Sequence, residues 1–150
     1  MPTIRPAGEA DIPILQKLYR QLALNPDDHD FESSAEGALQ AFHEIKAVPD
    51  YHLLVAEEEG AVVGTATLVV LPGIARKARR WAVIEYVVVD EKHRSKGIGQ
   101  ALMEYMAEMA REAGCYDVML SSNKLRKDAH RFYERLGYRA SHEAFHKFPE

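Results

Sequence analysis

The sequence predicts a single α/β domain whose strands form a mixed sheet. The chain has 150 residues, the usual size of one domain, so we treat residues 1–150 as one unit. Strand-like apolar runs occur along the chain together with segments of helical spacing, which is typical of this fold class. A composition of 47% hydrophobic and 28% charged residues is that of a globular protein and excludes a disordered chain.

The first half of the chain begins with a short strand and two helices. Residues 3–5 are a brief edge strand, and apolar residues spaced along one face predict a helix over 11–24. Asn25 and Pro26 end that helix. A second helix is predicted over about 33–46, with Ser33 or Ser34 as its N-cap.

The rest of the chain alternates strands with two further helices. Strands over 51–56 and 61–71 read as a hairpin, and a basic loop over 76–80 separates them from a third strand over 81–89. A long helix over about 97–113 ends at Gly114. The remaining predicted elements are a strand over 115–121, a helix over 127–136 and a final strand over 138–148.

Charge and cysteine content limit the function classes. A net charge of −4 argues against a dedicated nucleic-acid binder. The single cysteine, Cys115, cannot form an internal disulfide, which favours a reducing compartment. We see neither a signal peptide nor an apolar stretch of the roughly 20 residues that a membrane span needs. The expected location is therefore the cytoplasm, with no membrane partner.

A turn between the 81–89 strand and the long helix has the composition of a phosphate site. It contains Arg94, Ser95, Lys96, Gly97, Ile98, Gly99 and Gln100. Backbone N–H groups at a helix start suit an anion, and glycine lets a ligand approach the backbone. The spacing excludes a dinucleotide fingerprint, because Leu102 stands where the third glycine would be. The alternative is that the glycines serve the turn alone.

Glu85 is unusual because it lies in a strand that is otherwise nearly apolar. An ionised carboxylate there costs several kcal/mol unless it is paired or hydrated. Burial raises the pKa of a carboxyl group toward neutrality, as a general base near pH 7 requires. The sequence leaves two interpretations open, a functional carboxylate or a structural ion pair.

Tyr133 is the second candidate for acid–base chemistry. On the predicted helix, Phe132 and Leu136 share one face, whereas Tyr133 lies about 100° away. A phenol with a pKa near 10 suits the protonation of a thiolate leaving group. Core packing is the alternative for this aromatic segment.

Together these segments resemble the GNAT (GCN5-related N-acetyltransferase) superfamily. Residues 94–99 resemble its Arg/Gln-x-x-Gly-x-Gly/Ala pyrophosphate loop, and residues 129–138 resemble its Ala-x-x-Phe-Tyr-Glu-x-x-Gly-Phe/Tyr segment. The order of elements matches over essentially the whole chain. The resemblance implies a mixed, mostly antiparallel central sheet flanked by about four helices. Residues 121–138 are most similar to acetyltransferases of small amines, including aminoalkylphosphonate and aminoglycoside types.

The resemblance also implies acetyl-CoA as co-substrate and roles for particular residues. The cofactor-binding residues would be Val87, Val88 and Val89 along the pantetheine arm, residues 94–100 at the pyrophosphate, and Asn123 and Arg126. Glu85 would remove a proton from the amine, and Tyr133 would protonate the departing thiolate.

We therefore expect acetyl transfer to a small primary amine by direct attack. The alternatives are acetylation of a protein N-terminus or lysine, and a non-catalytic acyl-CoA-binding module. The resemblance also allows a homodimer.

One further motif is set aside. His142-Glu143-Ala144-Phe145-His146 spells a zinc-protease signature, but it lies in a predicted strand beside the C-terminus, with no room for a third ligand downstream. We therefore predict no metal in the reaction, and we leave open weak metal binding by His142 and His146, which would share one face of a strand.

Overall fold

A computed structural model describes residues 1–149 of the chain. It contains two compact units, Met1–Met119 and a second that begins at Leu120. That the whole chain acts as one acetyltransferase domain stays a prediction.

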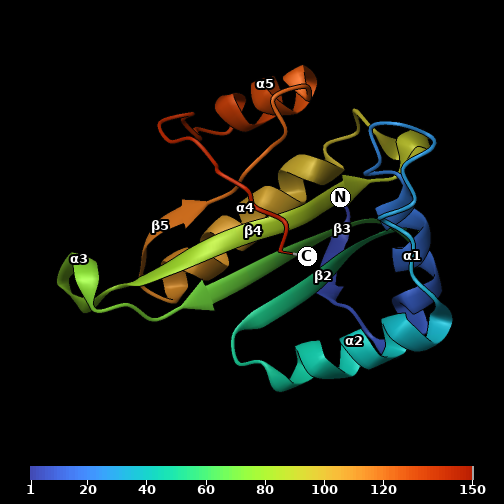
Figure 1. Cartoon of the computed structure of the whole chain (residues 1–150), viewed down its shortest axis with the longest axis horizontal. Helices are drawn as coiled ribbons and strands as arrows, with labels where there is room; N and C mark the ends of the chain where they lie inside the picture. Colours follow the sequence, from blue (N-terminus) through green and yellow to red (C-terminus); the bar gives the residue numbers. More distant parts are fainter. Residues whose placement is uncertain (150) are drawn as a thin grey trace. The chain divides into compact units, whose positions relative to one another are not determined.

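The first unit is built on a five-stranded sheet (Figure 1). Its strands are β1 (Thr3–Pro6), β2 (Tyr51–Glu58), β3 (Ala61–Leu71), β4 (Arg80–Val89) and β5 (Cys115–Met119), in that order across the sheet. The pairs from β1 to β4 are antiparallel, and β4 pairs with β5 in parallel. The predicted α/β class and the mixed, mostly antiparallel sheet are confirmed, with the first strand at the edge.

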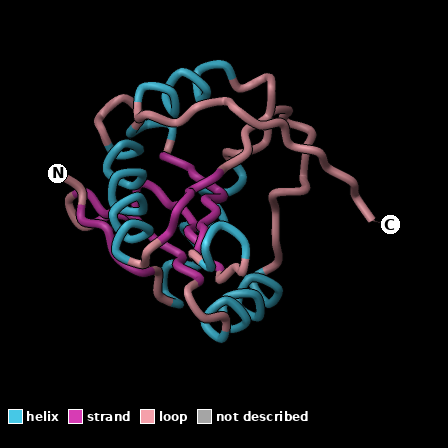
Figure 2. The backbone as a smooth tube through the Cα atoms, turned by 90° about the vertical axis from the view of Figure 1, so that its left-hand side faces the viewer, coloured by secondary structure: helices cyan, strands magenta, loops and turns pink. Residues whose placement is uncertain are grey.

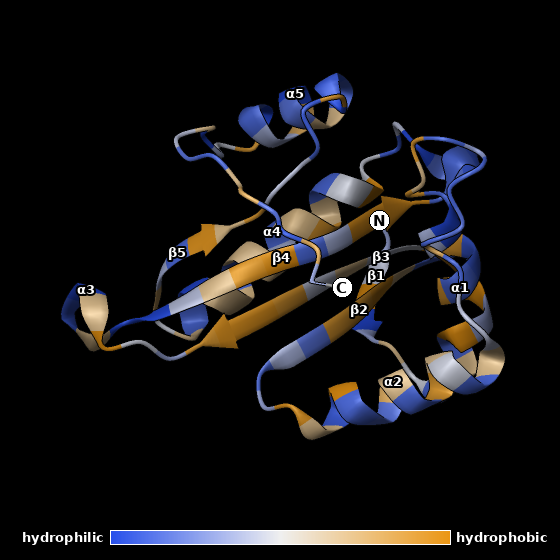
Figure 3. Ribbon diagram, in the orientation of Figure 1, coloured by the Kyte–Doolittle hydropathy of each residue, from blue (hydrophilic) through white to orange (hydrophobic). Residues whose placement is uncertain are grey.

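Helices cover both faces of the sheet, and Figure 2 shows them on two sides of the strands. Helices α1 (Ile12–Arg20) and α2 (Ala35–Ala47) pack on the face that carries Leu53 and Val55. Helix α4 (Ile98–Glu112) packs on the opposite face. Figure 3 shows the apolar character concentrated on the central strands, because residues of β3 and β4 are covered from both sides.

Gly64 of β3 sets how closely α4 approaches the sheet. A Cβ at this position would lie 3.2 Å from the carbonyl oxygen of Val88 and 3.3 Å from side-chain carbons of Ile98 and Leu102. The first turn of α4 therefore rests directly on the sheet where β4 ends. The sequence pattern did not identify this glycine, since its contacts are distant along the chain.

Several predicted boundaries hold, and others change. Ser34 is the N-cap of α2, and its hydroxyl accepts a hydrogen bond from the Gly37 amide at 2.9 Å. Helix α1 is shorter than predicted and is preceded by the 3₁₀ turn η1 (Glu9–Asp11). The predicted basic loop contains a short turn, α3 (Ala75–Ala78), in which Arg76 and Lys77 have positive φ. A second 3₁₀ turn, η2 (Glu91–His93), follows β4.

The second unit contains α5 (Lys127–Arg135), close to the predicted helix. The predicted final strand over 138–148 is wrong, because these residues form no strand. No other strand in the described part of the chain pairs with them. The strand argument that placed His142 and His146 on one face therefore no longer holds.

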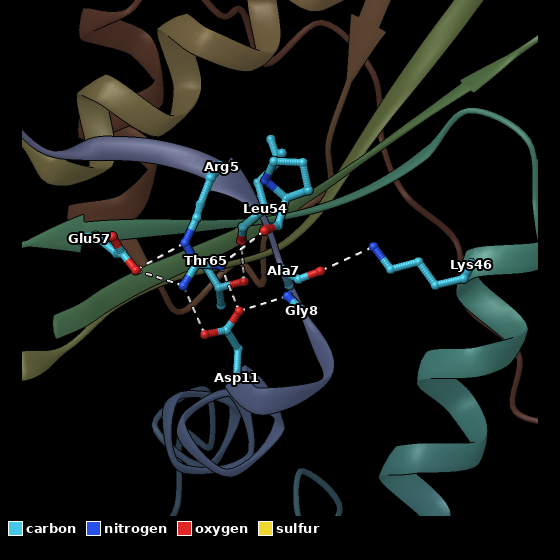
Figure 4. A network of polar contacts seen from close by, with 9 residues as sticks. Arg5, Ala7, Gly8, Asp11, Lys46, Leu54, Glu57 and Thr65 are labelled. Carbon is cyan, nitrogen blue, oxygen red and sulfur yellow. Dashed lines mark hydrogen bonds and ion pairs between the residues drawn. The ribbon is translucent and has the colours of Figure 1, made fainter. Parts of the chain in front are cut away.

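A polar network joins the edge strand to the start of α1 (Figure 4). Arg5 donates hydrogen bonds to both carboxylate oxygens of Asp11, at 2.7 and 3.0 Å, and to Glu57 at 2.7 and 3.0 Å. The Gly8 amide also donates to Asp11, at 2.7 Å. Hydrogen bonds from Arg5 hold the pKa of Asp11 below its ordinary value of 3.8, although its partial burial acts in the opposite direction.

We expect Asp11→Asn to destabilise the protein by about 1–2 kcal/mol at pH 7, because the buried Asp11 loses charge-assisted hydrogen bonds to Arg5, whose side chain is 34% exposed. The contribution of Asp11 is present above pH 3.8 and is lost as the pH falls through its lowered pKa. The difference between the two proteins should therefore shrink below about pH 4. Urea unfolding at pH 7 and pH 3 measures this. Asp27→Asn, in an exposed loop, is the control, and an equal difference at both pH values would contradict the expectation.

Candidate active site

Strand β4 separates from β5 halfway along its length. The parallel pairing ends with Val83 opposite Met119. Beyond this point the described strands provide a partner for β4 on one side only, the β3 side. The backbone of Val87 to Val89 therefore lies on a stretch of β4 that no longer pairs with β5, directly before the glycine-containing turn.

A β-bulge interrupts β4 near its centre. The pairs on either side of it are Thr65 with Val88 and Thr67 with Glu85. Two consecutive residues of β4, Tyr86 and Val87, therefore stand opposite the single residue Ala66. Tyr86 has a φ of 53°, in the left-handed region that side chains other than glycine enter at a cost. Such strain is concentrated at functional sites.

The turn after β4 leads into α4 with a set of exposed backbone donors. Gly97 is the N-cap, with a φ of 82°, and no atom lies within 4 Å of where its Cβ would be. The first helical hydrogen bond runs from the Ala101 amide to the Gly97 carbonyl, at 3.0 Å. The amides of Ile98, Gly99 and Gln100 belong to the first turn of α4, where helical geometry leaves backbone N–H groups without an acceptor inside the helix. These amides lie at the positive end of a 15-residue helix, an arrangement that suits an anion.

The side chains around this turn divide into exposed and buried ones. Arg94, Ser95 and Lys96 are exposed, and the Arg94 Nε donates to the Val89 carbonyl at 3.1 Å. Ile98 is 2% exposed and packs in the core, so only its backbone is available to a ligand. The Gln100 side chain donates to Glu104 at 2.8 Å.

Gln21, at the end of α1, forms hydrogen bonds with the first residues of this turn. Its Nε2 donates to Oδ1 of Asp90 at 2.9 Å, and its Oε1 accepts from the Glu91 amide at 3.0 Å. The Asp90 amide in turn donates to the Val63 carbonyl at 2.8 Å, and Nδ1 of His93 lies 2.9 Å from Oδ2 of Asp90. The side-chain hydrogen bond from Gln21 is the largest cause that lowers the pKa of Asp90, and the hydrogen bond with His93 lowers it further. Nothing in the pattern near Gln21 indicated this contact, which spans 69 residues.

Glu85 is half-buried on the face of the sheet that α1 covers. It pairs with Thr67, which pairs with Leu53, and Leu53 belongs to the core formed with α1 and α2. Tyr51 lies on the same face, because it precedes Leu53 by two residues. Burial raises the pKa of Tyr51, and the nearby Tyr86 and Glu85 raise it further.

In the second unit, Asn123 shapes the turn that starts α5. Its Oδ1 accepts from the Leu125 amide at 2.9 Å, and its carbonyl accepts from the Arg126 amide at 3.0 Å. Nε2 of His130 lies 2.9 Å from the same carbonyl. Arg126 is the N-cap residue of α5. The Asn123 oxygens thus serve the turn itself, and the cofactor role of Asn123 and Arg126 stays a prediction.

Tyr133 lies within an aromatic group of the same unit. Its ring centroid is 5.2 Å from that of Phe132 and 6.3 Å from that of Tyr138. Burial raises the pKa of Tyr138. The predicted role of Tyr133 as the acid for the thiolate stays a prediction.

Two findings concern metals and membranes. In residues 1–149, no group of three or more His, Cys, Asp or Glu side chains is arranged to hold a metal ion. Over the same range, none of the helices is both long enough and apolar enough to cross a bilayer.

Comparisons with known proteins agree on one family. The model of the acetyltransferase (GNAT) family matches residues 15–138. Glucosamine 6-phosphate N-acetyltransferase of Trypanosoma brucei brucei is 43% identical over 81 residues, which are 54% of this chain and 53% of that protein. Aminoalkylphosphonate N-acetyltransferase of Salmonella typhimurium strain LT2 is 38% identical over 99 residues, which are 66% of this chain and 64% of that protein.

Comparison with solved structures also finds an acetyltransferase fold. A solved structure from Agrobacterium tumefaciens strain C58 is 36% identical, covers 98% of this chain and 99% of its own, and has a TM-score of 0.89. The curated relatives are matched over about half to two thirds of their length. The predicted resemblance is confirmed: the chain belongs to the acetyltransferase (GNAT) family.

Proposed function

We propose that the chain is an acetyl-CoA-dependent N-acetyltransferase of a small primary amine. The observation that carries the proposal is the continuity of β4 with α4. The strand leaves its parallel partner after Val83, and its end leads into the donor amides of residues 95–100. The open stretch of β4 would hold the pantetheine arm, and the amides would hold the diphosphate. We also propose the cytoplasm as the location, because the single cysteine, Cys115, cannot form an internal disulfide, which favours a reducing compartment.

The acceptor class is proposed from the named relatives. The relatives from T. brucei and S. typhimurium act on glucosamine 6-phosphate and an aminoalkylphosphonate, and both substrates are small molecules that carry a primary amine. Glu85 lies where β4 still faces α1, beside the open stretch of the strand. A carboxylate there suits an ammonium group that must lose a proton before it attacks.

The chemistry proposed for the chain follows from these positions. Acetyl-CoA supplies an activated acetyl group, and the strand amides near Val87 would stabilise the negative charge that develops on its carbonyl oxygen. Glu85 would accept the proton of the amine, directly or through water. Tyr133 remains the proposed acid for the departing thiolate.

Direct transfer is favoured over a covalent intermediate on the protein. Burial raises the pKa of the Cys115 thiol, which leaves less of the nucleophilic thiolate at neutral pH. Cys115 opens β5 opposite Arg80, at the far end of β4 from the bulge. Cys115 is therefore a poor candidate for carrying the acetyl group.

A panel of acceptors tests the proposal by release of free thiol from acetyl-CoA. The panel contains amino sugars with and without a phosphate, aminoalkylphosphonates, simple alkylamines, and peptides with a free N-terminus or a lysine. We expect turnover with small amines. Turnover with peptides alone would overturn the small-amine proposal, and no turnover together with tight CoA binding would indicate a binding module.

We expect Gln21→Met to raise the KM for acetyl-CoA about three- to tenfold and to leave kcat nearly unchanged. Methionine has a similar shape but replaces neither hydrogen bond to the Asp90–Glu91 turn, and each such bond contributes about 1 kcal/mol. Steady-state kinetics with acetyl-CoA as the varied substrate measure the effect.

The matched control for this variant is Gln16→Met on the same helix. Gln16 donates to the Ser33 carbonyl at 2.9 Å, and neither of its side-chain hydrogen bonds among residues 1–149 reaches the turn. An equal rise in KM in both variants would show that the effect comes from α1 in general rather than from the contact made by Gln21.

A further inference from the structure

The bulge in β4 changes the direction of the Tyr86 side chain. In a regular strand, consecutive side chains point to opposite faces, so Tyr86 would point away from the face of Glu85. Its ring instead packs edge-to-face on Tyr19 of α1, with 5.8 Å between the centroids and 65° between the planes. Helix α1 covers the Glu85 face, so the bulge places two consecutive side chains, Glu85 and Tyr86, on one side of the sheet.

Three tyrosines from three elements therefore lie on the side of the sheet that carries the carboxylate. Tyr86 comes from β4, Tyr51 from β2 and Tyr19 from α1. The sheet register places Tyr51 diagonally across β3 from Glu85. We refer to Tyr19, Tyr51, Tyr86 and Glu85 as the tyrosine–carboxylate cluster.

The cluster is fixed on its inner side and open on its outer side. Burial is the main cause that raises the pKa of Tyr19, to about 12, and hydrogen bonding with Thr65 and Thr67 only partly offsets it. Thr65 and Thr67 are themselves buried, and the Thr65 hydroxyl donates to the Leu54 carbonyl at 2.7 Å. Tyr86, in contrast, is 50% exposed. Tyr19 thus forms a rigid support, and the ring of Tyr86 is accessible to a ligand.

This arrangement has the chemistry of a site for an organic cation. The faces of aromatic rings attract ammonium groups within about 6 Å, and a carboxylate adds direct charge attraction. The positive φ of Tyr86 costs conformational free energy. The bulge that requires this φ also turns the Tyr86 ring to the side of the sheet that carries Glu85.

We propose that the tyrosine–carboxylate cluster recognises the acceptor as an alkylammonium ion, through the ring of Tyr86 and the charge of Glu85. The inference rests on the proposed function, and it identifies the interaction by which the enzyme would select its amine acceptor. Tyr86 is a specificity-determining residue in this proposal: it binds the cation before Glu85 removes the proton. Neutral molecules of the same shape bind more weakly at this step, because they lack the positive charge.

Calorimetry of the CoA-saturated protein tests the binding step with a probe whose nitrogen cannot be acetylated. Choline carries a quaternary ammonium with no proton to lose, and 3,3-dimethylbutan-1-ol is its neutral isostere. We expect choline to bind at least tenfold more tightly than the alcohol. Equal affinity for the two compounds would overturn the proposal.

Substitutions at Tyr86 supply the second test. Leucine has a single substituent on Cβ, as tyrosine does, so Tyr86→Leu meets the same backbone conformation without the ring. We expect Tyr86→Leu to raise the KM for the amine at least fivefold, to leave the KM for acetyl-CoA within twofold, and to weaken choline binding. Tyr86→Phe keeps the ring and should restore both values to within about twofold of the wild type. Tyr105→Leu, an exposed tyrosine on α4, is the control.

The experiments distinguish failure of the cation site from failure of the proposed acetyltransferase reaction. Acetylation of amines with an unchanged amine KM in Tyr86→Leu would overturn the cluster and leave the acetyltransferase intact. Choline binding that depends on Tyr86, in a protein that acetylates no amine, would support the cation site and overturn the proposed reaction.

Discussion

Glu85→Gln is expected to lower kcat by a factor of about 10²–10⁴, the usual contribution of a positioned general base. The glutamine side chain has nearly the same shape but does not accept a proton at neutral pH. Glu85 lies on the α1 face of β4, apart from the amides of residues 95–100, so the KM for acetyl-CoA should stay within twofold. Steady-state thiol release with the best amine of the panel measures both constants.

The pH profile of the Glu85→Gln variant makes the test more specific. Without a base, only the amine that is already deprotonated reacts, and this fraction rises tenfold per pH unit below the amine pKa near 10. The rate of the variant should therefore keep rising with pH where the wild type has levelled off. Glu58→Gln, at a half-buried strand position beside the β2–β3 turn, is the matched control. A kcat within threefold of the wild type would remove Glu85 from the mechanism.

Gly97→Ala is expected to weaken CoA binding at least tenfold. An alanine at a φ of 82° is strained by about 1–2 kcal/mol. Its methyl group would also stand among the amides of residues 95–100, where a diphosphate must approach closely. No protein atom lies within 4 Å of the added Cβ, so the fold itself accommodates it. Isothermal titration with CoA measures the loss, and thermal unfolding reports the strain.

Gly60→Ala separates backbone strain from ligand binding. Gly60 lies in the turn between β2 and β3, has a φ of 81°, and likewise has no atom within 4 Å of its added Cβ. Both variants should lose similar stability, whereas only Gly97→Ala should lose CoA affinity. Unchanged CoA affinity in Gly97→Ala would show that the turn before α4 does not hold the diphosphate.

Local patterns were sufficient to predict most elements of the fold. The N-cap at Ser34, the hairpin of β2 and β3 and the long helix after Gly97 each follow from residues close together in sequence. The predicted final strand over 138–148 is wrong for the same reason, since residues close together in sequence carry no information about a strand partner. A strand exists only where another backbone accepts and donates its hydrogen bonds.

In the candidate site, too, features set by neighbouring residues were predicted, and features set by contacts between distant parts of the chain were not. The motif of residues 94–99 indicated the amide-rich turn, and an acidic residue in an apolar strand drew attention to Glu85. The bulge at Tyr86 was not predictable, because it depends on how β4 aligns with β3 about 20 residues earlier. The contact of Gln21 with Asp90 joins parts of the chain that only the folded sheet brings together.

The most direct test of the central claim observes the backbone amides themselves. Nitrogen-15 NMR of the labelled protein is recorded during titration with CoA and, separately, with pantetheine, which lacks the diphosphate. We expect CoA to shift the amide signals of residues 95–100 and of Val87 to Val89, and pantetheine to shift only the strand signals. If saturating CoA left the amides of residues 95–100 unmoved, the turn before α4 would not be the diphosphate site.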